Sequence, residues 1–95
     1  SSMPVVKEDL AVVVPEEVPS DQVGRLIREA GGEILVDVVL FDVYRGAQVG
    51  AGKKSLAFSL AFQSMTRTLT SEETARIRGR IVQRLEADLG AQIRS

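Results

Sequence analysis

The chain has 95 residues, 44% of them hydrophobic and 26% charged, which suits one ordinary globular domain with a single core. It contains no cysteine and no histidine, which excludes disulfides, zinc sites and histidine-based catalytic triads and leaves only carboxylate chemistry. The net charge of −1 lacks the basic excess of a typical nucleic-acid binder, so any RNA contact must be local or shared with a larger protein.

The first half of the chain predicts a strand, a helix and a second strand. The valine-rich run Leu10–Val14 is typical of a buried strand, and a proline-containing turn ends it. Ser20 can cap a helix whose apolar residues recur at helical spacing as far as Gly31-Gly32. Leu35–Tyr44 then predicts a strand with alternating faces, with Val39, Phe41 and Val43 inward and Leu40, Asp42 and Tyr44 outward.

The second half begins with a glycine-rich hairpin loop over residues 45–52. The strand Lys54–Phe62 has the clearest alternation, with Leu56, Phe58, Leu60 and Phe62 on one face and Ser55, Ala57, Ser59 and Ala61 on the other.

A second helix and a short strand follow. Thr70 and Glu73 form a capping box at the start of this helix, which carries an i, i+4 apolar stripe and ends at Gly90. Gly79 inside the helix indicates that something packs closely there. Ala91–Arg94 is long enough for a last strand.

The order β-α-β-β-α-β predicts an α+β, ferredoxin-like fold with two helices on one face of a four-stranded antiparallel sheet. The right-handed crossover rule places the first and third strands at the centre. Ser1–Met3 is typical of an expression scar, so the domain is assigned to residues 4–95. No signal peptide or membrane-spanning run is visible, and we expect a cytoplasmic protein with no membrane partner.

The uncovered sheet face is the candidate site. Alternation places a floor of small residues there, with Tyr44 at an edge and Asp42 and Ser55 nearby. A splayed nucleobase can stack on a tyrosine ring, while a carboxylate and a hydroxyl bind its edge. The pattern alone favours a protein partner or a sister domain covering this face over a nucleobase, and it leaves both possibilities open.

Two other sequence patterns are weaker indications of a binding site. Gly46–Ser55 departs from the phosphate-loop motif at Ala47 and Lys54 and precedes a strand rather than a helix, so Lys53 and Lys54 are at most point-charge contacts to RNA phosphates. A basic stripe along the second helix is typical of a solvated face with i, i+4 ion pairs; its members are Arg76, Arg80 and Arg84, with Glu72 and Asp88 as partners. No catalytic carboxylate pair is evident.

Three motifs in order resemble the ferredoxin-fold anticodon-binding domain at the C-terminus of the β subunit of bacterial phenylalanyl-tRNA synthetase. The resemblance covers Val6–Arg94. The motifs are Asp9-Leu10-Ala11, then Phe41-Asp42-Val43-Tyr44 with Gly52-Lys53-Lys54-Ser55-Leu56-Ala57-Phe58, then Arg67-Thr68-Leu69-Thr70 before Glu72-Glu73.

The resemblance implies an RNA-binding module that is itself non-catalytic and holds no cofactor. Its parent would be an α2β2 ligase that uses ATP and Mg²⁺, with the α subunit and the remainder of the β subunit as partners. The domain would hold the anticodon loop of phenylalanine tRNA, with the wobble guanine stacked on Tyr44 and read by groups matching Ala11, Asp42 and Ser55. Glu8 stands where the family often has arginine, so no phosphate contact is expected there.

Two other classes of protein share this order of strands and helices. A protein-interaction or regulatory module could use the same open sheet face, because fold alone does not fix function. A free-standing acylphosphatase-like enzyme is disfavoured, because the chain lacks a phosphate-cradling glycine loop and a suitable basic residue before the first helix.

Overall fold

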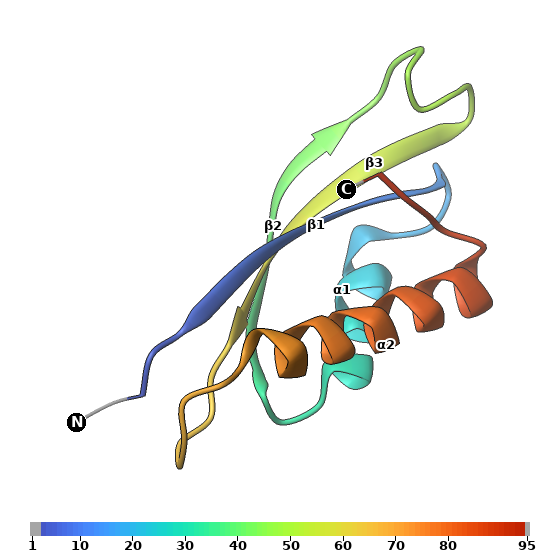
Figure 1. The fold of residues 1–95 in the computed structure, drawn as a ribbon. Coiled ribbons are helices and arrows are strands. Elements are labelled where there is room, and N and C mark those ends of the chain that lie inside the picture. Colours follow the sequence, from blue (N-terminus) through green and yellow to red (C-terminus); the bar gives the residue numbers. More distant parts are fainter. Residues whose placement is uncertain (1–2, 95) are drawn as a thin grey trace.

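A computed structural model describes residues 3–94 of the chain, and its elements follow the expected order (Figure 1). The first strand begins at Val6 rather than Leu10, the third begins one residue early, and the last is confined to two residues. The bounds are β1 Val6–Pro15, α1 Ser20–Gly31, β2 Leu35–Tyr44, β3 Lys53–Phe62, α2 Ser71–Leu89 and β4 Gln92–Ile93.

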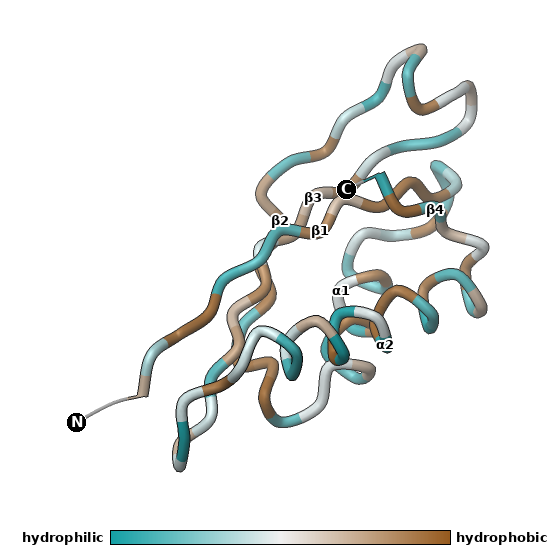
Figure 2. Tube along the Cα trace, viewed as in Figure 1, coloured by the Kyte–Doolittle hydropathy of each residue, from teal (hydrophilic) through white to brown (hydrophobic). Residues whose placement is uncertain are grey.

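The strands form one antiparallel sheet in the order β2-β3-β1-β4, which confirms the ferredoxin-like fold and its central pair of strands. Both helices lie on the same side of the sheet (Figure 1). We call the other side, which no helix covers, the open face. In Figure 2 hydrophilic and hydrophobic stretches alternate along α2, as expected for a helix with one buried side.

The core lies between the sheet and the two helices. Alternate residues of β1 and β3 point into it, as the sequence pattern predicted, and the expected stripe of α2 packs on them. The fully buried aliphatic and aromatic side chains, all with relative exposure below 2%, are Leu10, Val12, Val14, Val23, Ile27, Leu56, Leu60, Phe62, Ile81 and Leu85.

The predicted capping box of α2 is present. The backbone N–H of Glu73 donates to Thr70 Oγ1 at 3.1 Å, and the backbone N–H of Thr70 donates to Glu73 Oε1 at 3.1 Å. The hydrogen bond from Thr70 and an ion pair with Arg67 hold the pKa of Glu73 below its ordinary value. Gly90, with φ of 62°, ends the helix in the left-handed conformation.

Two local expectations are wrong. Ser20 does not cap α1, because the extended residue Pro19 occupies the cap position and its carbonyl accepts from the backbone of Gln22 and Val23; no side-chain cap forms there. Gly79 faces open space, because no atom beyond its chain neighbours and the surrounding helix backbone lies within 4 Å of where a Cβ would be. Close packing occurs instead at Gly31, where an added Cβ would collide with the side chain of Leu35.

Met3, the last residue of the segment interpreted as a scar, contacts the fold. The carbonyl of Met3 accepts a hydrogen bond from Gln63 Nε2 at 2.7 Å, just beyond the end of β3. Ser1 and Ser2 lie outside the described residues. Within residues 3–94, neither helix is long and apolar enough to cross a membrane.

Candidate nucleic-acid interface

Cross-strand pairing brings four of the predicted site residues together on the open face. Directly opposite residues of an antiparallel pair point to the same side, with their Cβ atoms about 4.5–5.5 Å apart. One row runs across all four strands and a second lies next to it, two residues along each strand. The Tyr44 row is Tyr44, Ser55, Val13 and Gln92, and the Asp42 row is Asp42, Ala57 and Ala11.

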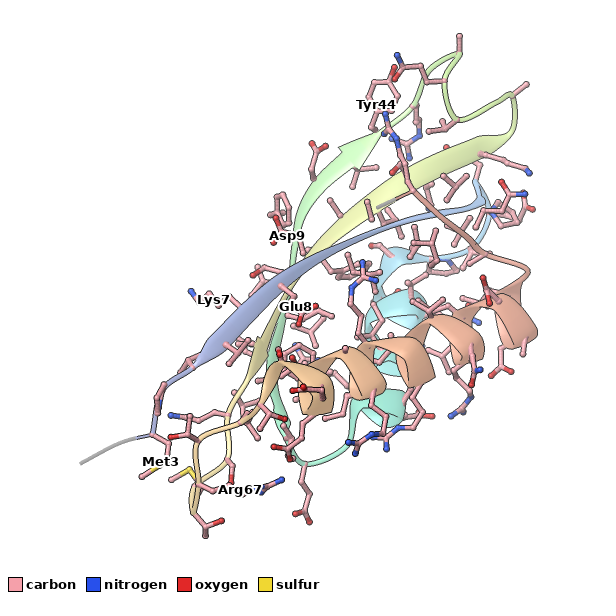
Figure 3. All side chains as sticks on the ribbon, in the orientation of Figure 1. Met3, Lys7, Glu8, Asp9, Tyr44 and Arg67 are labelled. Carbon is pink, nitrogen blue, oxygen red and sulfur yellow. The ribbon has the colours of Figure 1, made fainter. Side chains whose placement is uncertain are left out.

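These two rows form a patch with a defined chemistry. An aromatic ring and a carboxylate stand on the edge strand β2, a hydroxyl stands beside the ring, and alanines form the floor beside the carboxylate. Figure 3 shows Tyr44 at the hairpin end of the sheet and Met3 and Arg67 at the opposite end. The patch is therefore at the end of the molecule that carries the glycine-rich loop.

The ring of Tyr44 is held by two neighbours. The backbone of Gly46 packs against its hydroxyl end, where an added Cβ would lie 2.6 Å from Tyr44 Oη. The guanidinium carbon of Arg94 lies 5.0 Å from the ring centroid, within the range of a cation–π contact. Arg94 Nη2 also donates to Gln48 Oε1 at 3.0 Å. The ring is thus fixed at the border between the sheet and the hairpin loop.

The expected alternation of β2 is wrong in its middle. Leu40 lies opposite the core residue Phe58, and Val39 lies opposite Ser59, so Leu40 faces the helices and Val39 faces outward. A register shift between Leu40 and Asp42 inserts Phe41 as an extra, exposed residue. Such a bulge breaks the two-residue period, and the expected faces hold only after it. Asp42 and Tyr44 keep their predicted side.

The two predicted lysine contacts separate in the structure. Lys53 is exposed at the mouth of the hairpin. Lys54 pairs with Val14 on the helical side of the sheet, is only 7% exposed, and has its Nζ 3.7 Å from Glu16 Oε2. The ammonium of Lys54 is therefore engaged inside the fold, whereas Lys53 is exposed.

Glu16 joins the β1 end of the sheet to the hairpin loop. Arg45 Nη2 donates to Glu16 Oε2 at 2.9 Å, and Arg45 Nε pairs with the other carboxylate oxygen. The hydrogen bonds from Arg45, followed by its charge and that of Lys54, hold the pKa of Glu16 below its ordinary value. The same contact raises the pKa of Arg45. This ion-pair group anchors the loop that carries Gly46 next to Tyr44.

We expect the stability of the domain to fall on acidification in a way that depends on Glu16. The pKa of Glu16 is lower in the folded domain than in the unfolded chain. Its contribution to stability is therefore complete when the pH is above the unfolded pKa of about 4.3, and it disappears as the pH falls through the folded pKa. Glu16→Gln should remove this part of the pH dependence, measured by urea unfolding from about pH 3 to pH 7.

The matched control is the exposed neighbour Glu17, which forms no ion pair within residues 3–94. Glu17→Gln should leave the slope of stability against pH unchanged. Equal slopes for the wild type and Glu16→Gln would contradict the account of the hairpin anchor.

Most members of the basic stripe on α2 form contacts within the helix or with α1. Arg84 pairs with Asp88 at 2.9 Å as predicted, and these contacts, together with Glu29, raise its pKa. Arg80 donates to the carbonyls of Ala30 and Gly31 and so ties α2 to the end of α1. The expected pair between Glu72 and Arg76 does not form within the described chain. Arg80 and Arg84 thus link α2 to α1.

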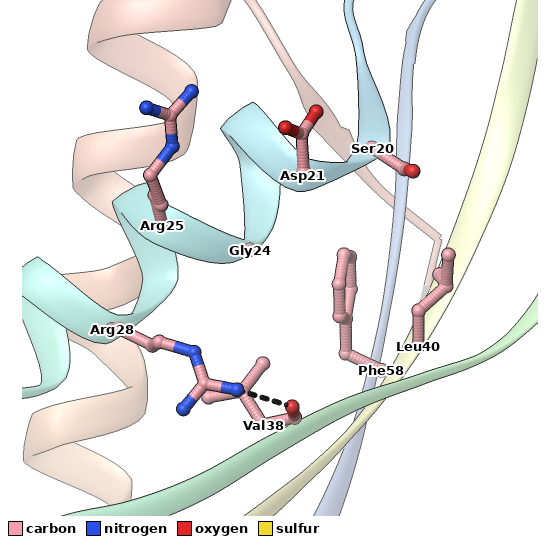
Figure 4. Close-up of a pocket in the computed structure, with 8 residues that line it drawn as sticks. All are labelled: Ser20, Asp21, Gly24, Arg25, Arg28, Val38, Leu40 and Phe58. Carbon is pink, nitrogen blue, oxygen red and sulfur yellow. Dashed lines mark hydrogen bonds between the residues drawn. The ribbon is translucent and has the colours of Figure 1, made fainter.

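A groove of about 400 Å³ lies on the helical side, between α1 and the edge strand β2 (Figure 4). Arg28 Nη2 donates to the carbonyl of Val38 at 2.8 Å, which occupies one backbone acceptor of the strand. Leu40 and Phe58 form its apolar wall. None of the predicted RNA-binding residues lines this groove, so it is separate from the open-face patch.

The class defined by these observations is a ferredoxin-like α+β domain whose open sheet face carries one aromatic ring with a carboxylate and a hydroxyl beside it. The family described as the ferredoxin-fold anticodon binding domain matches residues 1–94. The chain therefore belongs to this family, which confirms the resemblance seen in the three sequence motifs.

Curated relatives agree with this assignment. The chain is 53% identical over 91 residues to the phenylalanine–tRNA ligase beta subunit of Moorella thermoacetica, covering 96% of the chain and 11% of the relative. It is 46% identical over 91 residues to that of Clostridium tetani, covering 96% and 12%, and 47% identical over 94 residues to that of Corynebacterium efficiens, covering 99% and 11%. The chain thus spans about a tenth of the length of these relatives.

A solved structure supports the fold alone. The formyltetrahydrofolate deformylase of Pseudomonas putida KT2440 aligns with a TM-score of 0.51 at 14% identity, over 93% of this chain and 27% of that one. Such low identity shows a shared arrangement of strands and helices and does not transfer an activity.

Sequence reasoning missed two residues of the patch. Gly46 was predicted only as part of the glycine-rich hairpin loop, although its backbone packs on Tyr44. Arg94 was assigned only to a last strand, although it lies over the ring. A usable signal existed for Arg94, because an antiparallel β4 next to β1 places every second residue of β4 on the open face.

Proposed function

We propose that this chain holds the anticodon loop of phenylalanine tRNA, as the RNA-binding part of a phenylalanine–tRNA ligase β subunit. The single observation that carries the proposal is the convergence of Tyr44, Asp42 and Ser55 on adjacent cross-strand rows of the open face. The family and the relatives supply the substrate class. Catalysis, with its ATP and Mg²⁺, is assigned to other parts of a cytoplasmic α2β2 parent enzyme.

Each group has a role in reading a wobble guanine. The ring of Tyr44 provides the stacking surface, and stacking of one base contributes about 1–3 kcal/mol. The carboxylate of Asp42 accepts from the N1–H and N2–H donors of guanine, and the hydroxyl of Ser55 binds the same edge. Ala11 and Ala57 let the base lie close to the sheet. Lys53 is the proposed hairpin contact to a phosphate, and Lys54 is omitted because Glu16 engages it.

The hydrogen-bonding role of Asp42 is tested by changing the wobble base. Adenine lacks the N1–H and N2–H donors, so a stem-loop with adenine at this position should bind the wild type more weakly by about 1.5–3 kcal/mol. Asp42→Asn should reduce this penalty, because a neutral amide accepts from the two guanine donors less strongly than the carboxylate does. Isothermal titration with the two stem-loops measures both effects.

Asp37→Asn is the matched control, because Asp37 lies on the open face of the same strand but opposite Ala61, outside the two rows. It should leave the discrimination unchanged. If Asp42→Asn and wild type show the same penalty for adenine, Asp42 does not read the base.

A second candidate is a protein-interaction module that uses the same open face. The observation that favours it is the apolar character of β2, where Val39 on the open face and Phe41 in the bulge are exposed. Sedimentation of the isolated domain separates the two functions. A stable dimer that buries Tyr44 would favour this candidate, and a monomer that binds the stem-loop would favour the RNA-binding function.

A further inference from the structure

Arg94 extends the Asp42 row to the fourth strand. Its backbone N–H donates to the carbonyl of Ala11 at 2.8 Å, one step beyond the pair between Val12 and Ile93. Because Gln92 shares the open face with Val13, the alternation of β4 places Arg94 on that face too. The row is then complete across the sheet, with a carboxylate at one edge and a guanidinium at the other.

The side chain of Arg94 crosses the floor of the patch. Neighbouring strands lie about 4.8 Å apart, so the backbones of β4 and β2 are separated by roughly 14 Å, and only long side chains can meet over that gap. Arg94 and Tyr44 do meet, at 5.0 Å from guanidinium carbon to ring centroid. Ser55 points to the open face between the two edge strands and is only 4% exposed.

The described partners of Arg94 are neutral. They are the ring of Tyr44 and the amide oxygen of Gln48, whereas Arg45 and Arg84 lie against carboxylates. A cation–π contact at a partly exposed site is weaker than a charge-assisted hydrogen bond. The contacts that hold Arg94 over the ring can therefore be exchanged for a phosphate.

We infer that Arg94 is an RNA-contacting residue that rests on Tyr44 in the free domain and moves to a backbone phosphate when a base takes its place on the ring. This inference rests on the proposed function. The guanidinium lies over the ring surface that a stacked base needs, so binding has to displace it. The displaced cation supplies local positive charge to a chain whose net charge is −1.

Titration with the anticodon stem-loop at several salt concentrations tests the inference. Arg94→Ala should weaken binding about five- to thirtyfold, because a charge-assisted contact is lost and a weaker self-contact no longer has to be broken. The slope of log K against log salt should fall by about 0.7, the value for one phosphate on a single strand. Arg94→Lys keeps the charge and should keep the slope.

A structural readout accompanies the affinities. In the free protein the Arg94 side-chain Nε–H signal should carry a ring-current shift that disappears in Tyr44→Leu and is also lost when the stem-loop is added. Wild-type affinity and salt slope in Arg94→Ala, with binding still weakened in Tyr44→Ala, would overturn the role of Arg94 and leave the proposed function standing. Unchanged binding in both variants would overturn the proposed function with it.

Discussion

Replacing Phe62 with alanine is expected to lower the free energy of unfolding by about 3–5 kcal/mol. Phe62 ends the central strand β3, lies between Val6 and Leu35 in the sheet, and is completely buried in the core. Removing its ring leaves a cavity that the surrounding strands cannot close, because both neighbours are held by sheet hydrogen bonds. Since small domains have about 5–15 kcal/mol of stability in total, the variant should be marginally folded.

Phe41→Ala is the matched control for this substitution. It removes the same atoms from the bulge of β2, where the side chain is 56% exposed, and should change stability by no more than about 0.5 kcal/mol. Urea unfolding followed by circular dichroism measures both variants, and equal m values would show that only stability has changed. Similar losses for the two phenylalanines would contradict the assignment of the core to the helical side.

Replacing Tyr44 with alanine should weaken binding of the anticodon stem-loop by about 1–3 kcal/mol, or roughly five- to 150-fold in Kd. The ring is the stacking surface, so its loss should also reduce the difference between guanine and other wobble bases. In a complete synthetase the same substitution should lower kcat/KM by a comparable amount, because a uniform binding contact is removed.

Tyr44→Phe is the control that keeps the ring. Its affinity should stay closer to that of the wild type than to that of Tyr44→Ala, since the stacking surface is retained. Thermal unfolding of both variants must match the wild type within a few degrees, because Tyr44 is only partly buried and lies outside the core cluster. If the phenylalanine variant binds as poorly as the alanine variant, stacking is not the main interaction.

Local patterns predicted those parts of the structure that depend on neighbouring residues. The alternation of β3 gave its buried and open faces, and the capping box fixed the start of α2. The faces of β3 follow from the two-residue alternation of side chains along a strand, and the capping box follows from hydrogen bonds between residues three apart. The second strand was harder to predict, because the inserted residue Phe41 reverses the faces of Val39 and Leu40 before it, and no composition signal marks the bulge.

The candidate site was predicted in part for the same reason. Asp42 and Tyr44 follow the bulge, so their side was correctly expected. Lys54 was grouped with Lys53 as a contact to RNA phosphates, although its alternation with Leu56 already put it on the helical side. The contact of Arg94 with Tyr44 joins the two edges of the sheet and depends on the register of β4 against β1, which no local pattern contains.

The most direct test of the central claim is chemical-shift mapping of the labelled domain during titration with the anticodon stem-loop of phenylalanine tRNA. The account predicts that the perturbed amides cluster on the open face at the hairpin end, including those of Ala11, Asp42, Tyr44 and Ser55. Perturbations confined to α1, α2 and the groove lined by Arg28 and Phe58 would contradict it.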